Sequence, residues 1–108
     1  MFMEITGGIA PAGNSADFLE LKVCNVQMLT IQCQEYDAFV ATSSAALDTV
    51  TTRFKLSTFM AADGTAESGL ELNFPHTPYT GTLFFRSANT TNAARIVLLY
   101  ATANPGMY

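Results

Sequence analysis

Hydrophobic and polar residues alternate along most of the chain with a period of two, which is typical of β-strands. The clearest runs are 18–23 (Phe-Leu-Glu-Leu-Lys-Val) and 70–74 (Leu-Glu-Leu-Asn-Phe), where polar side chains separate the apolar ones. In a third run, 50–56, Arg53 and Lys55 fall on the face opposite Phe54 and Leu56. We therefore expect strands near 1–6, 17–24, 28–34, 36–41, 47–56, 69–74, 79–87 and 94–101.

Turn-forming residues separate these runs, beginning with Gly7-Gly8 and continuing through segments rich in Pro, Gly, Asn and Asp. Short strands joined by short turns predict an all-β fold: an antiparallel two-sheet β-sandwich of about eight strands, jelly-roll-like or immunoglobulin-like. Two segments also fit a helix, the apolar stripe within 36–47 and a single turn at 57–62, and neither changes the fold class. We expect one domain over 1–108, with 103–108 as a C-terminal tail.

The last third of the chain departs from simple alternation. In 94–101 the side chains of Ile96 and Leu98 fall on one face, whereas Val97 and Leu99 fall on the other. We expect 79–87 and 94–101 to pair as a hairpin, in which Phe84, Val97 and Leu99 form an exposed apolar patch typical of a protein interface. Tyr108 in the tail is a further candidate for the interface. Alternatively, the fold itself covers this hairpin.

The composition of the chain limits the kinds of partner that it can bind. The chain is 49% hydrophobic and only 13% charged, with a net charge of −4, which argues against a nucleic-acid ligand because phosphate binding needs clustered cations. No run of 18 apolar residues predicts a membrane span. The chain also lacks a basic segment followed by an apolar stretch near residue 1, so we expect no secretion signal and synthesis in a cytoplasm.

The two cysteines fall on opposite faces of neighbouring predicted strands. Leu19, Leu21 and Val23 alternate inward, which directs Cys24 outward, whereas Cys33 shares the inward face of the next strand. A disulfide requires Cβ atoms about 4 Å apart. We therefore expect two reduced cysteines.

Candidate catalytic groups are few. His76 is the only histidine and lies in a loop, while Glu35 and Asp37 share a strand face about 7 Å apart and are interpreted as solvated carboxylates. The segment 63–67 (Asp-Gly-Thr-Ala-Glu) reads as a turn rather than a calcium loop. Since no set of residues has the spacing of a catalytic, cofactor or metal site, we expect a protein that is not an enzyme and needs no cofactor.

The apolar segments 83–87 (Leu-Phe-Phe-Arg-Ser) and 94–100 (Ala-Arg-Ile-Val-Leu-Leu-Tyr), in a short chain poor in charge, resemble the small all-β accessory proteins of tailed-phage virions. This resemblance implies a capsid decoration or cement protein located in the virion. Such a protein forms a homo-oligomer, plausibly a trimer, and stabilises the shell by binding the major capsid protein. The hairpin would supply subunit packing, and loops 7–16, 62–69 and 75–79 would supply further contacts.

Two other functions remain open. A carbohydrate-binding β-sandwich module needs aromatic platforms, and the chain has no Trp, but four tyrosines could replace it: Tyr36, Tyr79, Tyr100 and Tyr108. The other alternative is another phage head or tail component, such as a fibre or tail accessory protein.

Overall fold

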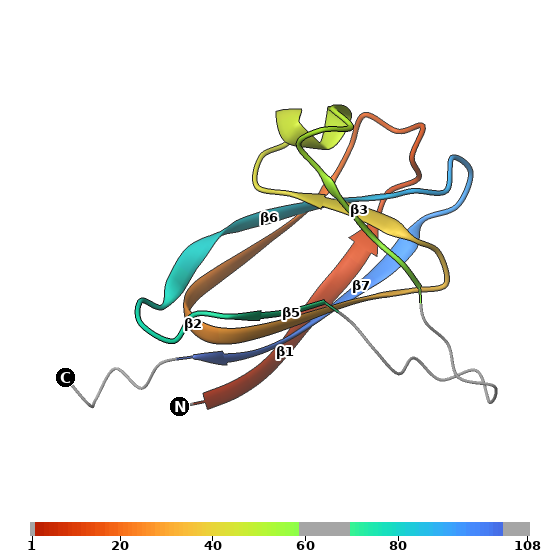
Figure 1. Ribbon diagram of the computed structural model, residues 1–108. Helices are drawn as coiled ribbons and strands as arrows, with labels where there is room; N and C mark the ends of the chain where they lie inside the picture. The colour runs from red at the N-terminus through yellow and green to blue at the C-terminus, as the bar shows by residue number, and fades with distance from the viewer. Residues whose placement is uncertain (1, 59–69, 103–108) are drawn as a thin grey trace.

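The computed structural model describes residues 2–58 and 70–102, which form seven strands and one short 3-10 helix (Figure 1). The predicted all-β, antiparallel character is confirmed. Within these residues no helix is long and apolar enough to cross a membrane. The elements are β1 (Phe2–Ala10), β2 (Leu19–Gln34), β3 (Ala38–Ala41), η1 (Ala45–Asp48), β4 (Phe54–Leu56), β5 (Leu70–Asn73), β6 (Tyr79–Ser87) and β7 (Ala94–Thr102).

All seven strands belong to one sheet, in the order β1-β7-β2-β6-β3-β4, with β5 also pairing with β2. Strand β2 has sixteen residues and two sets of neighbours: residues 19–26 pair with β6, and residues 26–34 pair with β7. The ladder shifts register on both sides of Val26, next to Asn25 at φ 58°. Asparagine tolerates this left-handed backbone better than most residues, so the sequence permits a bend here.

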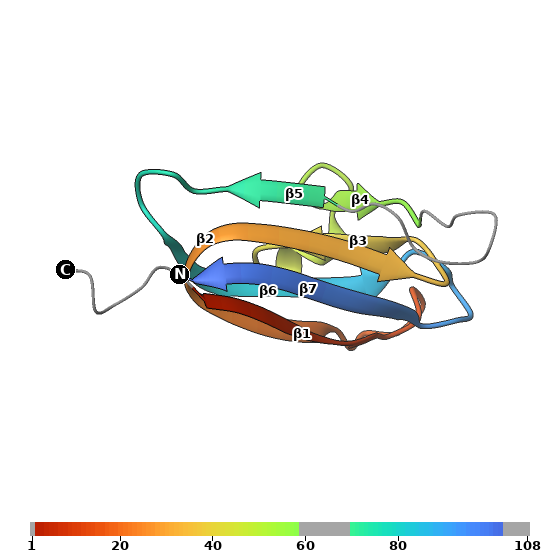
Figure 2. The same ribbon diagram turned by 90° about the horizontal axis from the view of Figure 1, so that it is seen from below.

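The bend in β2 folds the sheet over itself. Seen from below, β5, β2, β7 and β1 lie side by side, with β6 and β3 behind them (Figure 2). The prediction of about eight strands in two separate sheets is therefore not confirmed, because a single open sheet of seven strands continues through β2. The segments 17–24 and 28–34, expected as two strands, are the two halves of β2.

The core lies between the two halves of the bent sheet. Burial in β2 and β7 follows the period of two expected from the sequence, and Ile31 is paired with Leu98 across the ladder. Complete burial of one such side chain contributes about 1.5–3 kcal/mol. The largest fully buried apolar side chains come from three strands and η1: Phe85, Leu29, Ile31, Leu47, Ile96, Leu98 and Val26.

The predicted hairpin between 79–87 and 94–101 is wrong. Strand β2 lies between β6 and β7, with Leu19 opposite Phe85 in one half and Ile31 opposite Leu98 in the other. The physical reason is the length of β2, which offers an apolar inner face to both strands. The loop at 88–93 therefore connects the two halves of the bent sheet rather than two paired strands.

The predicted strand 47–56 is largely wrong as well. Its first part is η1 followed by a turn, and only Phe54–Leu56 forms a strand. Side-chain hydrogen bonds compete with strand formation here. The Ser43 hydroxyl accepts from the Ala46 backbone N–H at 3.1 Å, and the Thr52 hydroxyl donates to the Ala46 carbonyl oxygen at 2.9 Å.

Gly7 and Gly8, expected in a turn, lie inside β1, which pairs with β7 over nine consecutive residues. A Cβ atom at Gly7 would overlap the carbonyl oxygen of Ile96. Glycine at this position therefore permits the close approach of the two backbones rather than a change of chain direction.

Of the two possible helical segments, 36–47 contains β3 and η1 instead of one helix. The segment 57–62 extends beyond the described residues, as do 62–69 and the C-terminal tail.

Candidate functional site

Exposed apolar side chains are concentrated on β1. Met3, Ile5 and Ile9 are 55%, 73% and 56% exposed, and they alternate along the strand, so they lie on its outer face. Ile5 is opposite Leu99 of β7. Gly7, which lies between Ile5 and Ile9 along β1, is opposite Val97. The outer face of β1 and β7 is therefore a continuous apolar surface, which we call the β1–β7 face.

A shallow hollow of about 390 Å³ interrupts this face where Gly7 carries no side chain. Ile5 and Ile9 line it from β1, and Arg95 and Val97 line it from β7. Arg95 is paired with Ile9 in the ladder and supplies the positive charge at the hollow. The site can therefore accept an apolar side chain, with a cation at one end.

The structure separates the residues predicted as one interface. Val97 and Leu99 are half-buried on the β1–β7 face, as their alternation predicted. Phe84 lies on β6, which does not pair with β7, and its ring meets Phe18 edge to face at 5.2 Å between centroids. Phe84 is therefore not part of the patch that the expected hairpin would have made, and Tyr108 lies outside the described residues.

The sequence analysis missed the exposed apolar residues of β1, although a signal was present. Residues 2–10 alternate around Met3, Ile5 and Ile9, but in the sequence alone the Gly7-Gly8 pair predicts a turn that ends the strand. The proposed contact loop 7–16 must be corrected for the same reason, because its first residues belong to β1. The proposed loop 62–69 lies outside the described residues.

A second hollow, of about 420 Å³, is polar. It is lined by Glu35, Tyr36, Asp37, Lys55, Thr58, Ala88 and Asn89. The Asp37 carboxylate accepts from the Thr58 N–H at 2.7 Å and from the Thr58 hydroxyl at 2.9 Å. These bonds lower the pKa of Asp37, with Lys55 adding to the effect at 3.7 Å.

Glu35 and Asp37 both line this polar hollow, but the expectation that they share a strand face is wrong, because residues 35–37 connect β2 to β3 and lie in neither strand. The two carboxylates also have different environments. Glu35 is exposed and has a φ of 78°, a strained value for a non-glycine residue, whereas Asp37 is held by Thr58. Because its pKa is lowered, Asp37 stays ionised and cannot donate a proton near neutral pH. The hollow offers hydrogen-bonding groups to a polar ligand.

The other candidate groups lie apart. His76 is exposed in the loop before β6, and the described residues contain no cluster of three or more His, Cys, Asp or Glu side chains able to hold a metal ion. Cys24 is exposed and Cys33 is buried, both as free thiols, so the prediction from strand parity is confirmed. Burial raises the pKa of Cys33, whose thiol donates to the Leu56 carbonyl oxygen at 3.2 Å.

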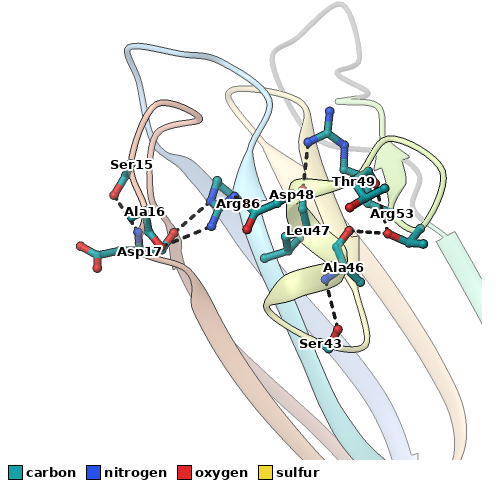
Figure 3. Close-up of polar contacts among 11 residues, drawn as sticks. Ser15, Ala16, Asp17, Ser43, Ala46, Leu47, Asp48, Thr49, Arg53 and Arg86 are labelled. Carbon is teal, nitrogen blue, oxygen red and sulfur yellow. Dashed lines mark hydrogen bonds and ion pairs between the residues drawn. The ribbon is translucent and has the colours of Figure 1, made fainter.

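Arg86 is a buried charge that the sequence did not single out (Figure 3). Its guanidinium pairs with the Asp48 carboxylate at 2.6 Å and donates to the carbonyl oxygens of Asp17 at 3.1 Å and Ala16 at 3.3 Å. Nearby, Arg53 donates to the Leu47 carbonyl oxygen at 2.9 Å. Arg86 holds η1 and the loop before β2 against the sheet, and Arg53 also holds η1, so the role of both arginines is structural.

Comparison with known proteins gave no significant match, whether to a family model, a curated protein or a solved structure.

Proposed function

We propose that this chain is a non-enzymatic structural protein of a virion, a decoration or cement protein that oligomerises and stabilises the shell by binding neighbouring subunits of the major capsid protein. The supporting observation is the β1–β7 face, where Met3, Ile5 and Ile9 are each more than half exposed. A contiguous apolar surface of this kind usually marks a protein interface.

A shell lattice suits such a surface physically. Each copy of the chain would meet several identical subunits, and multivalent attachment raises avidity without requiring a strong single contact. Binding to the assembled state alone stabilises that state by mass action. The low charge content, 13% of residues, favours association because few charged side chains have to lose their water.

The proposal is tested in two steps. Genes for a major capsid protein, a portal and a protease next to this one would identify the partner. Purified chain is then mixed with empty shells assembled from that capsid protein and sedimented. We expect saturable co-sedimentation at a fixed ratio and a higher disruption temperature of the shell. Shells that sediment without the chain, and that melt at an unchanged temperature, would refute the proposal.

Carbohydrate binding is the second candidate, and the polar hollow favours it. Tyr36 lies there beside the carboxylates of Glu35 and Asp37 and the amide of Asn89, groups that can stack on a sugar ring and bind hydroxyls. A glycan array separates the two functions. Binding that Tyr36→Ala abolishes and Ile5→Lys preserves would favour the sugar-binding module.

Another head or tail component, such as a fibre or tail accessory protein, differs from the main proposal only in its partner. Co-sedimentation with tails rather than shells would identify it.

A further inference from the structure

We propose that β1 is a self-association site, through which two copies of the chain pair antiparallel and extend one sheet into the other across a two-fold axis at Thr6. This inference deepens the proposed structural role and rests on it, since it names a second copy of the chain as one partner of the β1–β7 face.

β1 is an edge strand of the sheet. β1 lies at one end of the strand order and, among the described residues, pairs with β7 alone. Its ladder with β7 runs over nine residues without a register shift. The opposite edge of such a strand presents a row of backbone N–H and C=O groups from alternate residues, which is a template for another strand.

Proteins commonly protect edge strands with Lys, Pro, bulges or short length. Between Phe2 and Ala10 the only charged side chain is Glu4, and no proline or lysine is present. The other two edge strands of the described sheet are protected: β4 has three residues including Lys55, and β5 has four including Glu71. β1 is therefore an unprotected edge of the described sheet on which a second chain can pair over nine residues.

The sequence of β1 suits pairing with itself. An axis at Thr6 places Met3 of one copy opposite Ile9 of the other, and Ile5 opposite Gly7. Opposite residues share a face in an antiparallel pair, so the exposed apolar residues of both copies join on one side. Each Ile5 then lies beside the hollow at the partner's Gly7.

Glu4 and Pro11 disfavour other registers of the strand pair. With the axis at Thr6, Glu4 faces Gly8 of the other copy, so the two carboxylates do not oppose each other. An axis at Glu4 would bring them together. An axis at Gly7 would place Met3 opposite Pro11, which has no N–H to donate.

The size of the interface sets the expected affinity. A nine-residue strand is roughly 30 Å long, and an interface limited mainly to one strand falls below the roughly 1,200–2,000 Å² of stable complexes. We therefore expect a dimer with a dissociation constant in the micromolar range. Multivalent binding to a lattice would reinforce it.

Sedimentation velocity of the purified chain across the micromolar range tests the self-association. We expect a reversible monomer–dimer equilibrium that Ile5→Lys weakens at least tenfold. Val50→Lys is the matched control, because Val50 is 76% exposed against 73% for Ile5 but lies in a turn far from β1 in the sequence. Circular dichroism establishes that both variants fold.

Cysteine cross-linking in a Cys24→Ser background tests the register. Thr6→Cys places two thiols directly opposite each other, at the spacing of about 5.5 Å or less between Cα atoms that a disulfide accepts. Glu4→Cys places the thiols four residues apart along the strands, roughly 13 Å. We expect mild oxidation to link Thr6→Cys into a dimer and to leave Glu4→Cys unlinked.

A chain that remains monomeric throughout the range, or an Ile5→Lys variant that dimerises like the wild type, overturns the proposal. Cross-linking of Glu4→Cys without Thr6→Cys overturns the register at Thr6. The proposed function fails separately: shell binding by a monomeric chain refutes only the pairing through β1, whereas a dimer that does not bind shells refutes only the virion role.

Discussion

Replacing Arg86 with alanine should destabilise the fold more than any other single change among the charged residues of the described chain. The arginine is only 7% exposed and makes one ion pair and two hydrogen bonds to backbone carbonyls. These contacts join three segments that are far apart in sequence: β6, η1 and the loop before β2 (Figure 3). Alanine would remove all three contacts at once.

The magnitude follows from how exposed each partner is. A hydrogen bond to a charged group contributes about 1.5–3 kcal/mol when well shielded, but the Asp48 side chain is 67% exposed, so its ion pair falls in the surface range of about 0–1 kcal/mol. The two carbonyl bonds and the buried stem of Arg86 account for the rest. We expect Arg86→Ala to lower the free energy of unfolding by about 2–4 kcal/mol, a large part of the about 5–15 kcal/mol typical of a domain.

Urea denaturation followed by far-ultraviolet circular dichroism measures this loss. With a slope of about 1–3 kcal/mol/M, the midpoint of Arg86→Ala should fall by roughly 0.7–4 M. Asp48→Asn is the matched control, which removes the charge of the partner but keeps an oxygen acceptor, and should cost less than about 1 kcal/mol. Two results would refute the reasoning: an unchanged midpoint for Arg86→Ala, or an equal loss in both variants.

Three further predictions concern the titratable groups. A thiol reagent should label one cysteine per native chain, Cys24, and a second only in urea, because burial raises the pKa of Cys33; rapid labelling of both native thiols would contradict this. Hydrogen bonding lowers the pKa of Asp37. The contribution of the Asp37 carboxylate to the stability of the fold is therefore complete above pH 3.8, the ordinary carboxyl value, and is lost as the pH falls through the lowered pKa. Asp37→Asn should remove that acid-dependent loss from thermal melts. A hydrogen bond with Glu4, together with burial, raises the pKa of Tyr100. The contribution of Tyr100 to the stability of the fold is therefore complete below pH 10.0 and is lost as the pH rises through the raised value. The Tyr100→Phe variant should show a smaller loss of melting temperature at alkaline pH.

Alternation predicted most of the strands and their faces, apart from the segment 47–56 and the second half of β1, but it did not predict which strands pair. The inward direction of Leu29, Ile31 and Cys33 follows from the backbone geometry of a single strand, and all three side chains are buried in the structure. The choice of partner depends on segments far away in the sequence. A sixteen-residue strand can satisfy both β6 and β7, and nothing local distinguishes that arrangement from a hairpin.

The sequence predicted only the part of the candidate surface that lies on β7. Val97 and Leu99 face outward because Ile96 and Leu98 face inward, and this follows from the sequence. Their continuation onto β1 requires knowing that residues 2–10 lie next to 94–102, which is a long-range pairing. The glycines of β1 also look like a turn until the close backbone approach at Gly7 is visible.

The β1–β7 ladder joins residue 2 to residue 102, and this has a consequence for folding during synthesis. Among the described strands β1 is synthesised before the other six, whereas its partner β7 is synthesised after them. Contacts between such distant segments form slowly, and transiently exposed strand edges promote aggregation. Both edges of β1 therefore stay unpaired until β7 has been synthesised, so the speed of synthesis and the presence of chaperones should influence how much protein reaches the native state.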